Sequence, residues 1–386
     1  MARVLVVGAG VVGAACAYFL ARDGHEVTVV DRGPVGAGTT SRGEGNILVS
    51  DKSAGPELAL ALRSAELWRR IAERLGADAL EWESKGGLVV AATDETLGAL
   101  REFATLQAAA GVWCEPVEPG NLSGYEPNLA PGLPGGVFYP GDQQVQPVRA
   151  AAALLYAARV DGATVRHGVE VLGVRRRSDG PVRSVECRVD GAVVEIDADA
   201  VVNATGTWGG DVSARIGAPV PVLPRRGFIL VTEPLPHVVR HKVYTADYVS
   251  NVASGAAGLE TSVVVEGTRG GTVLIGASRE RVGFDTAISY PVLRTMAAQA
   301  VRIFPFLDRV SLLRVYTGFR PYCPDHLPVI GADPRIAGIY HACGHEGAGI
   351  GLAPATGEMI ADLLSDRSTF VPAEPFSPAR FVSEAA

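Results

Sequence analysis

Hydrophobic and polar positions are most clearly patterned at the two ends of the chain, and each patterned segment contains a glycine-rich turn. Residues 4–7, VLVV, are continuously apolar, as in a buried parallel strand. Residues 11–23 then predict a helix, and EVTVV predicts a second strand that ends at Asp31. Near the other end, residues 341–364, HACGHEGAGIGLAPATGEMIADLL, predict a turn that opens a helix, with Pro354 in the first helical turn.

The first turn has the spacing G-x-G-x-x-G, formed by Gly8, Gly10 and Gly13. Gly8 permits a tight turn, Gly10 lets a pyrophosphate approach the backbone, and Gly13 allows close packing of helix and strand. Asp31 follows at the distance where an acidic side chain binds ribose hydroxyls and repels a 2′-phosphate. This context predicts a dinucleotide site that disfavours NADP, against the alternative of an ordinary strand–helix turn. The motif does not distinguish FAD from NAD.

Length, composition and charge limit the number of domains and the classes of partner. The chain has 386 residues, 47% of them hydrophobic, and a formal net charge of −7. This size is enough for two domains with separate cores. The longest basic run is RRR at 175–177, so we expect no nucleic-acid partner.

Residues 4–21 could be read as a signal peptide or a membrane span because they are almost entirely apolar. The three glycines and the return of the chain as a second strand favour a strand–helix–strand unit instead. The five cysteines are odd in number and irregularly spaced, which is typical of reduced thiols. We therefore predict a cytoplasmic protein without a membrane span.

Several further motifs occur in a characteristic order along the chain. They are GAGTTSRGEGN (36–46), GATVRHGVEVLGV (162–174), DAVVNATGTWGGDV (199–212) and GFRPYCPDHLPVIG (318–331). Together with the two terminal turns, this set resembles the D-amino-acid oxidase superfamily of FAD-dependent enzymes, from residue 3 to about 364. GHEGAGIGLAPATG and RRGFILVTEPLP are most similar to its glycine-oxidase and cyanide-synthase branch.

The resemblance implies noncovalent FAD that spans both glycine-rich turns. The first turn would bind the ADP end, and the last helix would direct its N-terminus at the flavin N1–C2=O edge. The implied cofactor residues are Gly8, Gly10, Val11, Val12, Gly13, Asp31, Arg32, Thr39, Thr40, Ser41, Gly45, Asn46, Val169, Ala204, Thr205, Gly206, Trp208, Arg320, Gly344, His345, Glu346, Gly347, Ala348, Gly349 and Ile350.

The implied fold is α/β, with a Rossmann-like FAD-binding domain and an interleaved α+β substrate domain on a largely antiparallel sheet. The FAD-binding domain would comprise 1–50, 140–225 and 320–386, and the substrate domain 51–139 and 226–319. The pattern agrees, since an amphipathic helix is predicted at one segment and strands at four others: the helix at 57–76, and the strands at 86–92, 227–234, 261–267 and 271–278.

The resemblance also implies the reaction, which is oxidation of a CH–N bond in an amino acid or N-substituted amino acid. The imine then hydrolyses to a 2-oxo acid, and O2 accepts the electrons and becomes H2O2. Arg320 would hold the substrate carboxylate, with an ion pair to Asp325 as the structural alternative. Tyr244, Tyr248 and Tyr316 are candidates to assist, and His345 belongs to the catalytic set.

Some positions depart from the family pattern. Glu346 and small residues replace bulkier basic ones in the last loop, which leaves room for a substrate larger than glycine. Leu274 stands where monomeric sarcosine oxidase has its oxygen-activating lysine. The cysteine that links flavin covalently in that enzyme aligns near Gly318, although Cys323 is close in sequence.

Two further interpretations stay open at this point. His341, Cys343 and His345 alternate, so they could share one strand face and bind zinc or copper, but a buried strand is simpler and no metal is predicted. The chain could also be a flavoprotein subunit of a hetero-oligomeric dehydrogenase, or a flavin-binding protein without turnover. A homo-oligomer or an electron-transfer partner is compatible with the sequence.

Overall fold

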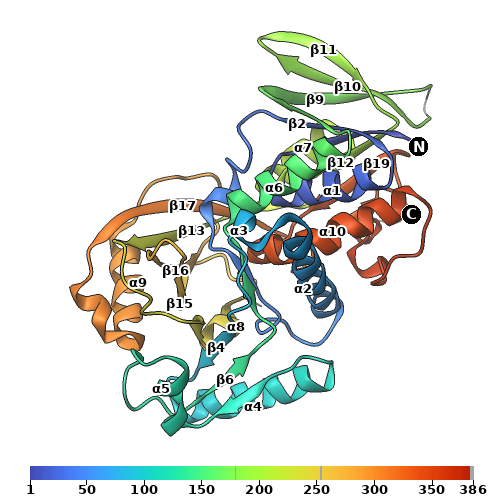
Figure 1. Cartoon of the computed structure of the whole chain (residues 1–386). Coiled ribbons are helices and arrows are strands. Elements are labelled where there is room, and N and C mark those ends of the chain that lie inside the picture. Colours follow the sequence, from blue (N-terminus) through green and yellow to red (C-terminus); the bar gives the residue numbers. More distant parts are fainter. Residues whose placement is uncertain (179, 253, 383–386) are drawn as a thin grey trace.

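The computed structural model describes residues 1–178, 180–252 and 254–382, and it is built on two large sheets (Figure 1). The first sheet has six strands in the order β18-β19-β12-β1-β2-β8. All neighbouring pairs are parallel except β18–β19. The strands are β1 (Arg3–Val7), β2 (Glu26–Asp31), β8 (Thr164–His167), β12 (Ala200–Asn203), β18 (Val329–Ala332) and β19 (Ile339–Cys343).

The second sheet has eight strands in the order β17-β13-β16-β15-β14-β4-β6-β5. Every neighbouring pair is antiparallel except β14–β4, so the predicted, largely antiparallel sheet is confirmed. Its strands are β4 (Gly87–Val90), β5 (Glu115–Val117), β6 (Gly136–Tyr139), β13 (Leu223–Thr232), β14 (Lys242–Thr245), β15 (Glu260–Gly267), β16 (Val273–Arg279) and β17 (Leu312–Tyr322).

The remaining strands form two small sheets. β9 (Val169–Arg176), β10 (Val182–Val189) and β11 (Ala192–Asp197) form an antiparallel sheet that projects beyond the first sheet at the top of Figure 1. β3 (Asn46–Ile47) pairs with β7 (Gln143–Gln144). The helices of at least six residues are α1 (Val11–Arg22), α2 (Pro56–Leu75), α4 (Asp94–Ala109), α6 (Pro147–Val160), α7 (Gly209–Arg215), α8 (Asp247–Val252), α9 (Tyr290–Ile303) and α10 (Gly349–Leu364).

Helix α1 is central to the packing because it contacts both α6 and α10. Small residues permit this proximity: a Cβ atom at Gly357 of α10 would lie 2.6 Å from the backbone of Ala15 in α1. Helix α2 also packs on α10, and its Trp68 is buried in the same apolar core as Val4 and Ala14. One core therefore joins the two ends of the chain to α2.

Pro354 is not in the first turn of α10, contrary to the sequence-based prediction. The helix begins at Gly349, so Pro354 lies inside it and cannot donate to the carbonyl of Ile350. The buried indole Nε1 of Trp68 donates to that carbonyl oxygen at 3.0 Å instead. A tryptophan of α2 thus satisfies the acceptor that proline leaves free.

The predicted domain boundaries fall within continuous strands. β13 runs through the boundary at 225/226, and β17 runs through the boundary at 319/320, so both strands extend toward the first sheet (Figure 1). Helix α2 was assigned to the substrate domain, but its buried residues belong to the same apolar core as those of α1. The division into two domains stays a prediction.

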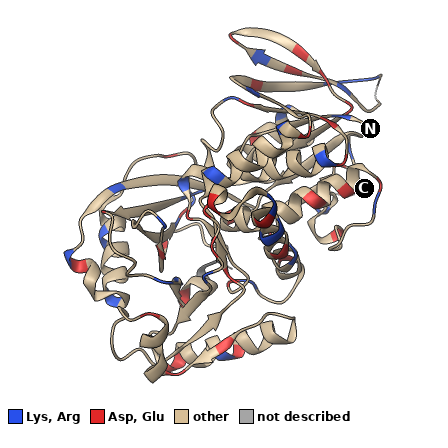
Figure 2. Ribbon diagram, in the orientation of Figure 1, with Lys and Arg blue, Asp and Glu red and all other residues tan. Residues whose placement is uncertain are grey.

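Basic and acidic residues are interspersed over the fold, and α2 carries both signs along its length (Figure 2). Cys16, Cys114, Cys187, Cys323 and Cys343 are all free thiols. Within the three described ranges, no helix has the length and apolar character needed to cross a membrane.

Candidate cofactor and substrate site

A cavity of 510 Å³ runs between the carboxyl ends of the parallel strands and the second sheet. Its wall includes the turn after β1, the end of β2, the start of β9, the turn after β12 and the loop before α10. Strands β13 and β17 close it on the side of the second sheet. Segments from both ends of the chain therefore line one continuous space, as a long ligand requires.

The first glycine turn is closely packed. Gly8 has a φ of +112°, and a Cβ atom there would lie 2.4 Å from the carbonyl oxygen of Ala204. At Gly13 a Cβ atom would lie 1.9 Å from Gly8 O, which excludes any larger residue. Gly10 lines the cavity and leaves the N-terminus of α1 accessible to an anion.

Asp31, at the end of β2, stabilises this turn and lines the cavity. Its Oδ2 accepts a hydrogen bond from Ala9 N at 2.7 Å, and its Oδ1 accepts one from Gly33 N at 2.8 Å. Next to it, the guanidinium carbon of Arg32 lies 4.4 Å from the centroid of the Trp208 ring. A carboxylate oxygen has more than one lone pair, so Asp31 can also accept from ribose hydroxyls.

Residues Thr39–Arg42 form a short 3₁₀ helix, η1, between the two ends of the cavity. Thr40 Oγ1 accepts from Val11 N at 3.0 Å, and Thr39 Oγ1 donates to Phe319 O at 2.9 Å. Ser41 points away, with its hydroxyl bonded to the carbonyls of Ala37 and Gly38. Its place in the 3₁₀ turn explains why it does not share the inward face of the two threonines.

The loop before α10 forms the far wall. Gly347, Gly349 and Ile350 line the cavity there, together with His345 and Glu346. His345 Nε2 lies 2.9 Å from Thr356 Oγ1, and burial lowers the pKa of His345 to about 3. Its imidazole is therefore neutral near pH 7, which places a polar but uncharged ring at the wall.

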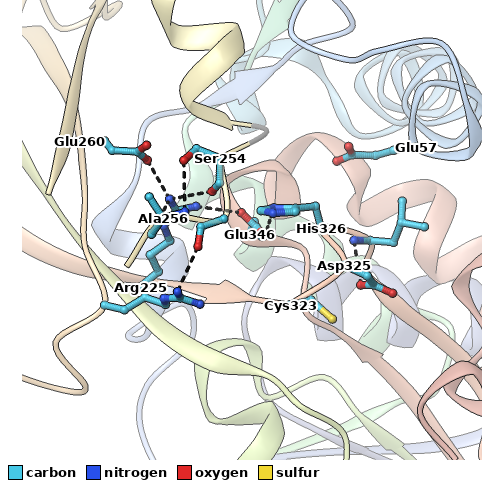
Figure 3. A network of polar contacts seen from close by, with 12 residues as sticks. Glu57, Arg225, Ser254, Ala256, Glu260, Cys323, Asp325, His326 and Glu346 are labelled. Atoms are coloured by element: carbon cyan, nitrogen blue, oxygen red, sulfur yellow. Dashed lines mark hydrogen bonds and ion pairs between the residues drawn. The ribbon is translucent and has the colours of Figure 1, made fainter. Parts of the chain in front are cut away.

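Glu346 belongs to a charged cluster behind this loop (Figure 3). Its carboxylate lies 2.9 Å from His326 Nδ1 and 3.6 Å from Arg225 Nη1. Arg225 is completely buried and also contacts Glu260 Oε2 at 3.0 Å and the carbonyl oxygen of Ser254 at 3.0 Å. Burial raises the pKa of Glu346, while His326 and Arg225 oppose that shift.

Arg320, on β17, lines the cavity and donates from Nη1 to Ser278 O at 2.7 Å. Gly227 on β13 makes room for it, since a Cβ atom there would lie 2.3 Å from that nitrogen. Within the described residues no carboxylate is within 4.0 Å of the Arg320 guanidinium. The alternative ion pair with Asp325 is wrong, because Asp325 pairs with Arg380 at 2.6 Å.

Glu44 was not among the predicted residues, although it lies in the GAGTTSRGEGN motif. It is buried at the cavity wall, and its Oε1 has no hydrogen-bond partner in the described part of the chain. Burial raises its pKa, and Lys242, 3.6 Å away, opposes that shift. A ligand with an N–H donor, such as the flavin of FAD, would satisfy this orphaned acceptor.

Most of the predicted residues lie together around the cavity. Those on its wall are Gly8, Gly10, Val11, Val12, Asp31, Arg32, Thr39, Thr40, Asn46, Val169, Ala204, Thr205, Gly206, Trp208, Tyr248, Arg320, His345, Glu346, Gly347, Gly349 and Ile350. Those behind the wall are Gly13, Ser41, Gly45, Gly344, Ala348, Tyr244 and Tyr316.

Two of the three candidate tyrosines do not line the cavity. The Tyr244 hydroxyl donates to Ser50 Oγ at 2.5 Å within the core, and burial raises its pKa. The Tyr316 hydroxyl donates to Gly43 O at 3.2 Å. Sequence alternation along a strand does not specify which face meets a ligand, so only Tyr248 remains at the wall.

Sequence reasoning also missed Arg42, Gly227 and Phe284 on the wall. Phe284 stacks on Trp208 with ring centroids 5.8 Å apart and packs edge-on against Phe319. A single aromatic in a polar loop carries no periodic signal, so its position depends on the tertiary fold. Arg42 could have been selected because it adjoins the threonines of η1.

The metal alternative has no support in the contacts of its three residues. His341 Nε2 lies 3.2 Å from Asp333 Oδ2, Cys343 packs beside Gly209, and His345 contacts Thr356. Each side chain therefore has its own partner. Across the described ranges no group of three or more potential ligands is suited to a metal ion.

Comparison with known proteins decides the family. The DAO family model, FAD dependent oxidoreductase, matches residues 3–363. The chain belongs to this family. It is therefore an FAD-binding oxidoreductase that acts on amino-acid-like substrates with a CH–NH donor.

Two relatives and one solved structure document the similarity. Glycine oxidase from Geobacillus kaustophilus is 30% identical, over 99% of this chain and 97% of its own length. Hydrogen cyanide synthase subunit HcnC from Pseudomonas aeruginosa is also 30% identical, with the same coverage of both chains. The solved structure of the Geobacillus glycine oxidase superposes with a TM-score of 0.86 at 29% identity, over 99% of this chain and 100% of that one.

Proposed function

We propose that this FAD-dependent oxidoreductase is an amino-acid oxidase that dehydrogenates the CH–N bond of an amino acid or N-substituted amino acid. The substrate carbon loses a hydride, the nitrogen loses a proton to water, and a C=N bond forms. Water then adds to the imine and releases a 2-oxo acid with ammonia or an amine. The electrons pass to O2, which becomes H2O2.

One observation carries this proposal, namely that Arg320 faces the cavity without a carboxylate partner in the three described ranges. Its guanidinium lies at the cavity wall without a carboxylate within ion-pair distance in the described residues. An enclosed charge without a partner is costly, and a substrate carboxylate would remove that cost. The planar fork of arginine also suits a carboxylate, so Arg320 would hold the amino acid with its CH–N bond toward the cofactor.

FAD would be held by the residues that line the rest of the cavity. The N-terminus of α1 at Gly10, Val11 and Val12 would bind the pyrophosphate, and Asp31 would bind the adenosine ribose. Residues 345–350 would surround the flavin, and Glu44 would accept a hydrogen bond from it. When bound, FAD supplies the two-electron acceptor for the substrate hydride.

The neutral His345 would contribute by its lack of charge. A protonated imidazole at the wall would compete with Arg320 for the substrate carboxylate and would disfavour loss of a hydride nearby. The burial that keeps the pKa of His345 near 3 avoids both effects. Tyr248 would border the substrate end of the cavity.

We further propose that FAD is bound without a covalent link. A Cβ atom at Gly318 would lie 2.7 Å from the carbonyl oxygen of Arg42, so this position cannot hold a linking cysteine. Cys323 is fully buried behind the wall, and burial raises its pKa. Acid precipitation should therefore release free FAD into the supernatant, and flavin retained in the pellet would contradict this.

A second candidate is a flavoprotein subunit that passes electrons to another protein. The similarity to HcnC, a subunit of hydrogen cyanide synthase, favours it. Leu274, at the position of the sarcosine oxidase lysine, lies on β16 outside the cavity wall. Oxygen consumption by the isolated chain would separate the two candidates, since a subunit that needs its partner would turn over only with an artificial acceptor.

The test of the proposed function is an anaerobic screen of amino acids and simple amines. Each compound is added to the holoenzyme under argon, and bleaching of the flavin absorbance is followed. At least one compound with a carboxylate next to its CH–N bond should reduce the flavin. Reduction by carboxylate-free amines alone would contradict the proposal.

A further inference from the structure

Arg279, the last residue of β16, is a second arginine without an ionic partner near the cavity. Only 4% of its surface is exposed. Its backbone pairs with Glu260 of β15, but no hydrogen bond or ion pair joins its guanidinium group to any residue of the described ranges. The guanidinium carbon lies 5.3 Å from the centroid of the Tyr248 ring. Such burial of an unpaired charge is rare unless a ligand completes the site.

The surroundings of Arg279 belong to the substrate end of the cavity. Arg279 lies directly behind the cavity wall, and Tyr248, which it contacts, lines the cavity, as do Arg320 and Glu346. The adjacent Ser278 carbonyl accepts the hydrogen bond from Arg320, so the two arginines are joined through one residue of β16. Burial lowers the pKa of Arg320 to about 10, and repulsion from Arg279 is the second cause.

The acidic residues nearby are already engaged with other cations. Glu346 contacts His326 and Arg225, and Glu260 contacts Arg225 (Figure 3). Glu44 faces Lys242. Arg225 therefore has carboxylate partners, whereas Arg279 and Arg320 have none within 4.0 Å in the part of the chain that the structure describes. Arg279 and Arg320 are therefore two arginines of this region without a direct carboxylate contact in the described residues, although Glu346 and Glu44 lie close enough to interact with them electrostatically.

We propose that the preferred substrate is an amino or imino acid with a second carboxylate, which Arg279 binds while Arg320 holds the first. This inference rests on the proposed function and narrows its substrate class. Two guanidinium forks can each take one carboxylate, so a dianion would give each arginine the direct partner that it lacks. A neutral amino acid would leave Arg279 without a carboxylate contact.

The first test compares matched substrates in the wild-type holoenzyme. Aspartate and glutamate of both configurations and iminodiacetate are assayed beside asparagine, glutamine and N-methylglycine. The best dicarboxylate should exceed its amide or monocarboxylate counterpart in kcat/KM by about 10- to 100-fold, the range expected for hydrogen bonds to a charged group. Equal kcat/KM values, or a preference for a neutral or basic amino acid, would overturn the inference.

Variants then assign the effect to Arg279. Arg279→Met keeps a long apolar side chain over Tyr248 and should reduce the dicarboxylate preference to about threefold or less. Arg281→Met is the matched control, because Arg281 lies two residues away and its Nη2 donates to Gly255 O. The control should keep the preference, and loss of the preference in both variants would show a general charge effect and refute a specific role for Arg279.

A binding measurement covers the case in which Arg279→Met does not fold. Succinate and glutarate are titrated into wild-type holoenzyme beside their monoamides, with the flavin spectrum as readout. The dicarboxylates should bind at least about tenfold more tightly, and equal affinity would refute the inference. If no amino acid reduces the flavin, the proposed function itself fails, whereas reduction without dicarboxylate preference refutes only this narrower inference.

Discussion

At the scale of single residues, the cavity wall includes polar side chains that already form some of their hydrogen bonds within the protein. Asp31 accepts hydrogen bonds from the backbone of Ala9 and Gly33, which fixes its carboxylate beside the first turn. Arg320 donates from Nη1 to Ser278 O, and its other N–H groups can bind a ligand. These contacts hold the side chains in place before the ligand binds, so binding requires less loss of side-chain freedom.

Asp31→Ala should weaken FAD retention while the fold stays largely intact. The substitution removes a carboxylate that would bind the ribose, and the exposed edge of the turn can bond water instead. Flavin content per protein after dialysis measures the effect, with circular dichroism as the control for folding. Full retention of flavin by the folded variant would show that Asp31 only supports the turn.

At the scale of secondary structure elements, helix α10 depends on its neighbour α2. Pro354 interrupts the hydrogen-bond ladder of α10, and Trp68 of α2 supplies the missing donor to Ile350 O. Ser64 of α2 also accepts from Ala355 N at 3.3 Å. Because α10 begins at the cavity, this contact helps to position the loop that we assign to the flavin.

Trp68→Phe should lower the free energy of unfolding by about 1–3 kcal/mol, because the buried carbonyl of Ile350 loses its donor. In the background of Pro354→Ala the same substitution should cost less, since the alanine N–H can then bond that carbonyl. Urea unfolding of the four proteins in this cycle measures the coupling. Equal costs in both backgrounds would show that Trp68 acts by packing alone.

At the scale of the whole molecule, segments distant in sequence meet at buried polar groups beside the second sheet. Asp142 is fully buried, and its carboxylate accepts from Val49 N at 2.8 Å and from Ser50, whose hydroxyl also accepts from Tyr244. Burial raises the pKa of Asp142 to about 7. The contacts that join the segment after β3 to the second sheet are therefore sensitive to the protonation of one carboxyl group.

Asp142 should make the protein less stable as the pH rises. Its folded pKa lies above its unfolded value near 4, so its stabilising contribution is complete below about pH 4 and is lost as the pH rises to about 7. Asp142→Asn removes this titration and keeps an acceptor for Val49 N. The thermal midpoint of the variant relative to wild type should increase between pH 4 and 7, whereas a constant difference would show that Asp142 does not titrate there.

The sequence predicted local features better than long-range ones. The strands and helix around Gly8, Gly10 and Gly13 were correct because glycine spacing and apolar runs are local signals. The start of α10 was misplaced, since the donor that tolerates Pro354 comes from α2. Glu44, Phe284 and Arg279 were missed because their position near the cavity depends on how the two sheets face each other.

The central claim is that Arg320 binds the carboxylate of an amino-acid substrate. Its pair with that carboxylate should contribute about 2–4 kcal/mol, so Arg320→Ala should lower kcat/KM by about 30- to 1000-fold. Arg320→Lys should also be impaired, because lysine keeps the charge but loses the fork. FAD content should stay near normal in both variants.

The most direct measurement is kcat/KM of wild type and Arg320→Ala for the best amino acid found in the screen and for its decarboxylated analogue. We predict a large loss for the amino acid and a loss of about threefold or less for the amine, since the amine offers no group for the guanidinium. Equal losses for the two compounds would show that Arg320 is structural and would contradict the assignment of the carboxylate site.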